Sequence, residues 1–304
     1  MKKRIIRIII FLLIFLGLDW SVSSILRMGM ERYYGIGQDA DILVIGHSHM
    51  MKTCNKIKLE KELKLKIAKY CREGVLVPQR QKMVQHFLEA QKNHTVPLVL
   101  YGVDPLMFAN SDDLSTNSYK LFYPFMETPI MDEYVREEAS LWDYSLHKYV
   151  RTTRFSDTAI YRSARGWLGY WESLASGTIS DADWKKPRPW KVFMPEKNVK
   201  IFRDTINQLV ASGAHVVLVY PSIVKSYETS NPEAFQYMMN YFRTLADDNP
   251  NIDFLNYAPL ISHHQEFFED PVHINRKGEI VFTNELIKDL KIIIAKKRGT
   301  ASEK

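Results

Sequence analysis

A single stretch decides the fold: Asp41-Ile42-Leu43-Val44-Ile45-Gly46-His47-Ser48-His49. Its apolar run is typical of a strand buried in a parallel sheet, where both faces of the strand are covered. The run ends in a glycine and a serine, and the carboxyl ends of parallel strands are where open α/β sheets bind their ligands. We therefore take Ser48 as a candidate nucleophile and ask whether the chain supplies a base and an acid.

Strand-like and helix-like segments alternate on both sides of this stretch. Apolar runs predict five strands, over residues 41–45, 65–70, 96–104, 214–221 and 251–256. Helical spacing of apolar residues predicts helices over residues 50–63, 79–91, 199–211, 232–246 and 275 to about 296. This alternation predicts an α/β fold: a three-layer, flavodoxin-like parallel sheet of about five strands with helices on both faces.

The composition is that of an ordinary globular protein. Of 304 residues, 46% are hydrophobic and 25% are charged, and the net charge is +6. The charge includes basic clusters at the two ends and forms no basic stripe interleaved with aromatics, so we expect no nucleic-acid partner. Two cysteines exclude a disulfide scaffold and a cysteine-rich zinc site. Cys54 and Cys71 are left as either one disulfide or two buried thiols.

The N-terminus resembles a membrane anchor or a signal segment. Lys2, Lys3 and Arg4 precede a mostly apolar stretch whose unbroken centre, residues 8–18, fits either a signal-peptide core or a membrane span. Apolar residues resume beyond it, so we favour an uncleaved anchor, with Asp19 near the outer interface. The positive-inside rule places the N-terminus in the cytoplasm and the body of the chain outside. The predicted organisation is an anchor (1–28), a linker (29–40) indicated by Gly29, Gly35 and Gly37, a catalytic domain (41–296) and a basic tail (297–304).

A large insertion interrupts the domain at residues 105–195. It carries five of the six tryptophans, namely Trp142, Trp167, Trp171, Trp184 and Trp190. With neighbouring arginines these could form an open groove that stacks on sugars and pairs with uronate carboxylates. Aromatic residues are more often core, and we expect this for most of them.

The chain supplies a base and an acid for Ser48. A serine nucleophile needs a base within hydrogen-bond reach, and the base needs an acid that fixes its tautomer. Asp270 and His273 are three residues apart just before the last helix, so both side chains can lie on one side of a turn. Ser48 could otherwise be a turn serine that bonds only the backbone. The predicted catalytic residues are Ser48, His273 and Asp270.

Several further residues lie at the predicted edge of the sheet. His47, His49, Asp104 and Tyr220 are candidates for substrate binding, and Asp104 could instead be a structural cap. His47 and His49 could also hold a metal with His263, His264 and Asp270. No pair of histidines has i, i+4 spacing on a clear helix, so we predict no metal and no other cofactor.

These motifs resemble the SGNH (GDSL-like) hydrolase superfamily. Its Gly-Asp-Ser block is matched by Gly46-His47-Ser48, and its Asp-x-x-His block by Asp270-Pro271-Val272-His273. The resemblance implies an oxyanion hole made by the backbone amides of Ser48 and Gly74. The third block, Gly-x-Asn-Asp, is matched only by Gly102-Val103-Asp104, which lacks the asparagine and weakens the expected hole.

Within the superfamily the chain is most similar to membrane-anchored members that act on cell-envelope polymers, such as alginate-type O-acetyltransferases and the D-alanine-transfer protein of teichoic acid modification. The resemblance implies a serine esterase or O-acyltransferase that acts on an exported or envelope polysaccharide or an acylated sugar. It also implies a multi-pass membrane acyltransferase as a partner. The alternative is an inactive SGNH-like domain that binds polysaccharide or such a partner.

Overall fold

The core of the molecule is a parallel sheet of five strands in the order β2-β1-β3-β4-β5. A computed structural model describes residues 2–91, 95–109, 117–171, 176–186 and 192–302. The strands are β1 (Ile42–Gly46), β2 (Ile67–Cys71), β3 (Leu98–Gly102), β4 (His215–Tyr220) and β5 (Ile252–Asn256). Every neighbouring pair is parallel, and this strand order is the flavodoxin-like one. The predicted α/β class and the predicted sheet are confirmed.

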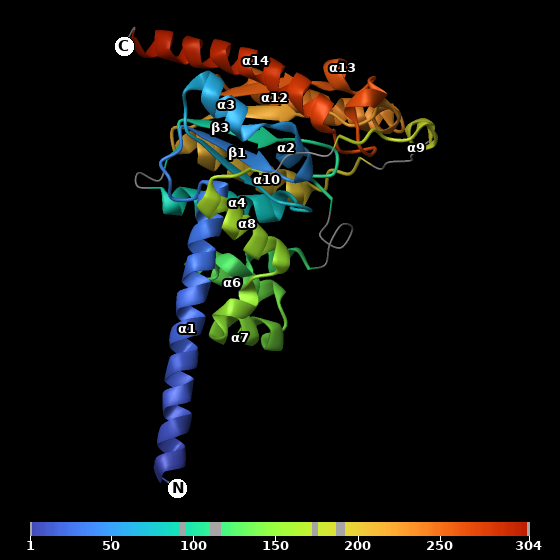
Figure 1. The fold of residues 1–304 in the computed structure, drawn as a ribbon. Coiled ribbons are helices and arrows are strands. Elements are labelled where there is room, and N and C mark those ends of the chain that lie inside the picture. Colours follow the sequence, from blue (N-terminus) through green and yellow to red (C-terminus); the bar gives the residue numbers. More distant parts are fainter. Residues whose placement is uncertain (1, 92–94, 110–116, 172–175, 187–191, 303–304) are drawn as a thin grey trace.

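Helices cover both faces of the sheet because the strand residues alternate between two apolar clusters (Figure 1). Leu43 and Ile45 of β1 face one cluster, and Ile42 and Val44 face the other. The first cluster takes residues from α4 (Val77–Ala90), α10 (Glu196–Ala211) and α12 (Pro232–Asp247). The second takes residues from α2 (Ser48–Thr53), α3 (Lys56–Leu63), α13 (Ala258–Ile261) and α14 (Arg276–Ser302).

The helix predicted over residues 50–63 is two helices. The chain leaves the helical conformation at Cys54, and the Asn55 side chain then caps α3 by accepting a hydrogen bond from the Lys58 amide at 3.0 Å. An asparagine at this position competes for backbone donors and so favours a helix start. As a result α2 is short, and it begins directly at Ser48.

The N-terminal helix α1 (Lys2–Tyr34) is the one helix among the described residues that is long and apolar enough to cross a membrane. It does not end in a linker: residues 29–34, predicted to belong to one, are helical. Met30, Tyr33 and Tyr34 are buried, and the Tyr34 ring packs against Tyr70 of β2 at 5.2 Å. This burial outweighs the glycines that suggested a linker, so the C-terminal half of α1 is part of the folded body.

The insertion is helical and packs largely on α1. Its elements are η1 (Ser118–Phe125), α6 (Pro129–Glu138), α7 (Leu141–Tyr149), η2 (Arg151–Arg154), α8 (Asp157–Leu168) and α9 (Asp181–Lys185). Helix α8 runs along α1 (Figure 1). The two backbones approach closely, because a Cβ on Gly166 would lie 1.8 Å from the Gly29 carbonyl oxygen.

The tryptophans of the insertion do not form one core. Trp142 is 86% exposed and Trp167 is 41% exposed, so these two are not core residues. Trp171 stacks on Tyr33 with ring centroids 4.1 Å apart, and Trp184 packs against Phe268. Trp190 lies outside the described residues.

The two cysteines are free buried thiols, which decides between the two alternatives left by the sequence. Burial raises the pKa of Cys54 to about 11 and that of Cys71 to about 12. Both thiols are therefore protonated at neutral pH and unreactive.

Candidate active site

Ser48 is the first residue of α2, immediately beyond the carboxyl end of β1. Two glycines allow the helix to begin so close to the sheet. A Cβ on Gly46 would lie 2.7 Å from the Met50 side chain, and one on Gly102 would lie 2.0 Å from it. Met50 therefore fills the space above the ends of β1 and β3, and only glycine fits at these positions.

The loop before α14 brings a base and an acid to Ser48. His273 Nε2 lies 2.8 Å from Ser48 Oγ, and His273 Nδ1 lies 2.8 Å from Asp270 Oδ2. A carboxylate can only accept here, so Nδ1 carries the proton and Nε2 is free to accept the hydroxyl proton of Ser48. The order of the three groups is that of a serine nucleophile, its base and an orienting acid.

Asp270 is held in the ionised form by its hydrogen bonds. Its Oδ1 accepts hydrogen bonds from the backbone amides of Val272 and His273, each at 2.9 Å. Burial by itself raises the pKa of Asp270, but these bonds and the His273 side chain outweigh it and lower the pKa to about 2. The carboxylate therefore carries its charge throughout the neutral range.

Asn275 fixes the shape of this loop. Its fully buried amide group donates to the carbonyl oxygens of Gly177 at 2.8 Å and Glu266 at 2.9 Å. Its Oδ1 accepts from the Lys277 amide at 2.9 Å at the start of α14. One buried side chain thus ties the loop, the insertion and the last helix together.

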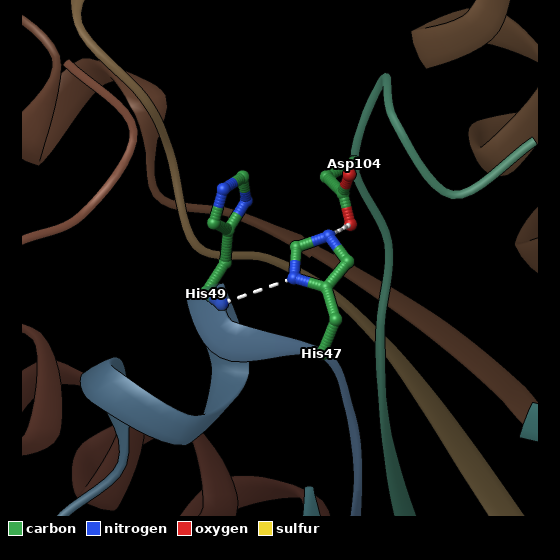
Figure 2. Close-up of side chains that lie close together, drawn as sticks. All are labelled: His47, His49 and Asp104. Atoms are coloured by element: carbon green, nitrogen blue, oxygen red, sulfur yellow. Dashed lines mark hydrogen bonds and ion pairs between the residues drawn. The ribbon is translucent and has the colours of Figure 1, made fainter. Parts of the chain in front are cut away.

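His47 and Asp104 form a second, buried histidine–acid pair beside the first (Figure 2). His47 Nε2 lies 2.6 Å from Asp104 Oδ2, and His47 Nδ1 accepts a hydrogen bond from the His49 amide at 3.0 Å. Since Nδ1 accepts, the proton of the neutral ring is on Nε2 and faces the carboxylate. His47 therefore caps the N-terminus of α2 and links it to the end of β3.

Arg80 of α4 is the third member of this buried cluster. Its Nη1 donates to the Gly102 carbonyl oxygen at 2.7 Å, and its Nη2 lies 3.5 Å from Asp104 Oδ2. Burial raises the pKa of Asp104, but His47, then His49 and Arg80, outweigh it, and the pKa is well below its usual range. Burial lowers the pKa of His47, so the pair is a carboxylate and a neutral imidazole. Asp104 also caps the loop that follows β3, accepting from the Leu106 amide at 2.9 Å.

His49 lies between the two histidine–acid pairs. Its ring meets that of His47 edge to face at 4.2 Å and that of His273 at 5.4 Å. Its Nδ1 is buried and has no hydrogen-bond partner. Burial holds the pKa of His49 well below its usual range, so the ring is neutral. A neutral imidazole next to a nucleophile and its base keeps one N–H to donate and one nitrogen to accept.

The two remaining predicted residues, Gly74 and Tyr220, lie at the ends of other strands. Gly74 is exposed in the turn after β2, with a φ of +64° that favours glycine. Its oxyanion role stays a prediction. Tyr220 is fully buried at the end of β4, and its hydroxyl donates to Glu228 Oε1 at 3.1 Å. That burial contradicts direct contact of Tyr220 with a substrate, because its hydroxyl already has a partner inside the core.

Two groups of histidines and acids are close enough together to be candidate metal sites. The atoms of His47, His49 and Asp104 lie near one another, as do those of Glu269, Asp270 and His273. Ligands around a tetrahedral zinc are about 3.3 Å apart, whereas His47 Nε2 and Asp104 Oδ2 are 2.6 Å apart, a hydrogen-bond separation. Arg80 adds a positive charge to the first group, and Ser48 and Asp270 already occupy both nitrogens of His273. Neither group fits a metal as it stands.

Sequence reasoning missed Arg80 and Asn275. Arg80 carries a readable signal, because it continues the apolar helical stripe of Met83, Val84 and Phe87, where a cation must find a buried partner. Asn275 has no comparable signal, since a polar residue before a helix is usually only a cap.

Comparisons with known proteins gave no sequence relative. No family model matches the chain, and no curated protein matches it. Among solved structures, a Bacteroides fragilis protein provisionally described as an acylhydrolase matches with TM-score 0.42 and 9% identity over 82% of this chain and 86% of its own. The C-terminal catalytic domain of Streptococcus pneumoniae peptidoglycan O-acetyltransferase A (OatA), solved with a methylsulfonyl adduct, matches with TM-score 0.38 and 12% identity over 83% and 92%. A pneumococcal protein provisionally described as a platelet activating factor matches with TM-score 0.41 and 11% identity over 93% and 98%.

Proposed function

We propose that the chain is a serine-dependent acyl-transfer enzyme of the SGNH type, an esterase or an O-acyltransferase. The observation that carries this proposal is the position of His273, with one nitrogen 2.8 Å from Ser48 Oγ and the other 2.8 Å from Asp270 Oδ2. A turn serine needs neither contact. The motif resemblance around Ser48 and His273 supports the same conclusion.

The geometry supports a two-step reaction. Ser48 Oγ attacks the acyl carbonyl carbon while His273 Nε2 takes its proton, and Asp270 stabilises the resulting imidazolium. The tetrahedral intermediate collapses, and His273 gives the proton to the leaving alkoxide, which leaves an acyl-serine. An acceptor hydroxyl then attacks the acyl-serine while His273 takes its proton; the bond from the acyl carbon to Ser48 Oγ breaks, and His273 returns the proton to Ser48 Oγ. Water as acceptor gives an esterase, and a sugar hydroxyl gives a transferase.

The oxyanion donors in this mechanism are the backbone amides of Ser48 and Gly74. Asp104 occupies the place of the asparagine of the third SGNH block and is an ionised acceptor, so it cannot donate to an oxyanion. Its role is to position: through His47 it fixes the first turn of α2 and hence the Ser48 amide. The buried neutral ring of His49, whose centroid is 5.4 Å from that of His273, is a side chain that can take the missing donor role.

The proposed substrate is an acylated polysaccharide or sugar of the cell envelope, with a multi-pass membrane acyltransferase as a partner in the transferase case. This part rests on the resemblance and on α1. The chain is proposed to be a single-pass protein of the cytoplasmic membrane, with its basic N-terminus inside and its catalytic domain outside.

The fold supports an anchor that is retained. Cleavage near Ser24 would remove Asp19, whose carboxylate accepts hydrogen bonds from the Arg151 and Thr152 amides at 2.8 Å each. N-terminal sequencing of the chain from a membrane fraction tests this. A chain that starts near Ser24 contradicts the anchor.

A second candidate function is a binding module without turnover, favoured by the carboxylate of Asp104 where the family has a donor amide. A fluorophosphonate probe separates the two. The enzyme requires labelling of the wild type that is lost in Ser48→Ala and kept in Ser230→Ala, a change at an exposed serine. An unlabelled wild type favours the binding module, and labelling that survives Ser48→Ala removes Ser48 from the mechanism.

A further inference from the structure

Helix α7 carries its apolar residues on the outside. One side of the helix is held to the molecule by polar groups: Tyr119 and Tyr123 donate to Asp143, and Tyr144 and Lys148 contact Asp132. The opposite side is solvent-facing and apolar, with Leu141 83% exposed, Trp142 86%, Leu146 48% and Tyr149 75%. This is the reverse of the pattern of an ordinary surface helix.

Hydrogen bonds fix the C-terminal end of α7 to one position along α1. The 3-10 helix η2 follows α7, and Asp19 of α1 accepts hydrogen bonds from the Arg151 amide, the Thr152 amide and the Thr152 hydroxyl at 2.8, 2.8 and 2.6 Å. Figure 1 shows α7 beside α1, on the side of the sheet from which the N-terminal half of α1 projects. The height of α7 along α1 is therefore fixed at about Asp19.

That level lies within the span of a bilayer. A hydrocarbon core of about 30 Å takes about 20 helical residues at about 1.5 Å each, so a span that begins after Arg4 ends near Ser24. Asp19 then lies roughly 7 Å inside the outer boundary. The outward side of α1 is apolar past this point, with Trp20 57% exposed and Ile25 56% exposed. The carboxylate of Asp19 can reach this depth because three donors satisfy it.

We propose that α7 is an interfacial membrane helix that inserts Leu141, Trp142, Leu146 and Tyr149 into the outer leaflet beside α1. The occupant of this surface is lipid, because the exposed apolar side of α7 lies beside Asp19, within the apolar length of a helix long enough to span the membrane. Tryptophan and tyrosine are the residues that prefer the lipid–water interface. The chain thus has two membrane contacts, a spanning one and an interfacial one.

This inference rests on the membrane-anchor part of the proposed function and is independent of its chemistry. The test uses the full chain in phospholipid vesicles, with a bimane fluorophore attached to a single introduced cysteine. The two native thiols are buried and protonated, so the label goes to the new one. The reporters are Trp142→Cys and Tyr149→Cys on α7, Leu13→Cys on α1, and Tyr237→Cys on α12 as the matched control. Tyr237 is also an exposed aromatic, 69% exposed.

Lipids that carry a nitroxide near the top of the acyl chain report on the α7 reporters and on Tyr237→Cys, and lipids that carry it near the end of the acyl chain report on Leu13→Cys, which lies near the middle of the span. We expect quenching at both α7 reporters to exceed that of Tyr237→Cys by about threefold or more at every protein-to-lipid ratio. Strong quenching of Leu13→Cys with control-level quenching on α7 overturns this inference alone. Weak quenching of Leu13→Cys overturns the anchor as well. Quenching on α7 that disappears as protein density rises points to a second copy as the occupant and also overturns the proposal.

Discussion

His273 Nε2 lies 2.8 Å from Ser48 Oγ, although the two residues are 225 positions apart in the chain. Parallel strands bring this about, because the carboxyl ends of β1 and β5 lie at one edge of the sheet and the loop after β5 returns across it. The same loop carries Asp270, so a single turn delivers both partners of the nucleophile.

Replacing Asp270 tests the orientation of the base. Asp270→Asn keeps the size of the side chain but removes the acceptor that holds the Nδ1 proton, so His273 can adopt the wrong tautomer. We expect the rate of hydrolysis of a chromogenic acetyl ester to fall by about 10⁴-fold in kcat. Glu266→Gln, at an exposed acid in the same loop, should leave the rate unchanged. Equal rates in Asp270→Asn and the wild type would exclude the acid from the mechanism.

The lowered pKa of Asp270 also predicts a pH dependence of stability. Folding depresses this pKa from 3.8 to about 2, so its stabilisation is present above pH 3.8 and is lost as the pH falls through about 2. The shift corresponds to about 2 kcal/mol before screening, and since 43% of the side chain is exposed we expect about 1 kcal/mol. Urea unfolding of the wild type and Asp270→Asn should differ by this amount at pH 7 and converge near pH 2. A constant difference would contradict the link.

The pair His47–Asp104 should be worth far more than a similar pair at the surface. The His215–Asp253 pair has the same separation of 2.6 Å, but the Asp253 side chain is 39% exposed and that of Asp104 only 3%. Asp104→Ala leaves His47 Nε2 without its acceptor and the buried Arg80 without its counter-charge, and we expect a loss of about 3 kcal/mol in the free energy of unfolding. Asp253→Ala should cost less than about 1 kcal/mol. Similar losses would mean that the buried cluster does not hold α2.

Asp19 should control the docking of η2 on α1. Asp19→Ala removes three hydrogen bonds to a charged acceptor, and we expect a local loss of about 2 kcal/mol. Hydrogen exchange should accelerate at the Arg151 and Thr152 amides and stay unchanged in β4. The control Glu137→Ala removes an exposed acid of α6. Unchanged protection of both amides would show that η2 is held by other contacts.

The close approach of α1 and α8 depends on glycine. In Gly166→Ala the new Cβ would lie 1.8 Å from a backbone oxygen of α1, so the two helices must separate. We expect a loss of about 2–3 kcal/mol in the free energy of unfolding. Gly17→Ala is the matched control, because a Cβ on Gly17 meets nothing within 4 Å. Equal stability of the two variants would contradict tight packing at this crossing.

The sheet and the residues around Ser48 could be predicted because their signals are local. Val44 and Val217 belong to short apolar runs with a glycine or a proline at or just beyond the end, which favours buried parallel strands. Asp270 and His273 are three positions apart, so a turn suffices to bring them together. Both predictions, the strands and the Asp270–His273 turn, needed only the residues next to each other in the chain.

The rest depended on packing between distant segments. Gly29 and Gly35 suggested a linker, but α1 continues because Gly29 faces α8 and Tyr34 is buried beside β2. Tyr220 was expected at an open edge, and its hydroxyl instead bonds Glu228 in the core. The partner of Gly29 cannot be read from the neighbouring sequence, because the position of α8 is fixed only by the complete fold. Glu228 is eight residues from Tyr220, but its burial becomes visible only in the complete fold.

The unbroken course of α1 from its exposed apolar end into the folded body has a mechanical consequence. A domain on a flexible linker can take many orientations relative to the membrane. A domain that is continuous with its membrane helix has no hinge and keeps one orientation. For a membrane-bound chain, Ser48 would then stay at one distance from the membrane and in one orientation. The position of α1, and not diffusion of the domain, would decide which part of a substrate Ser48 can contact. With the polysaccharide substrate proposed above, the polymer would have to move past a fixed Ser48, so inserting a flexible joint after Tyr34 should change which stretch of a long substrate reacts.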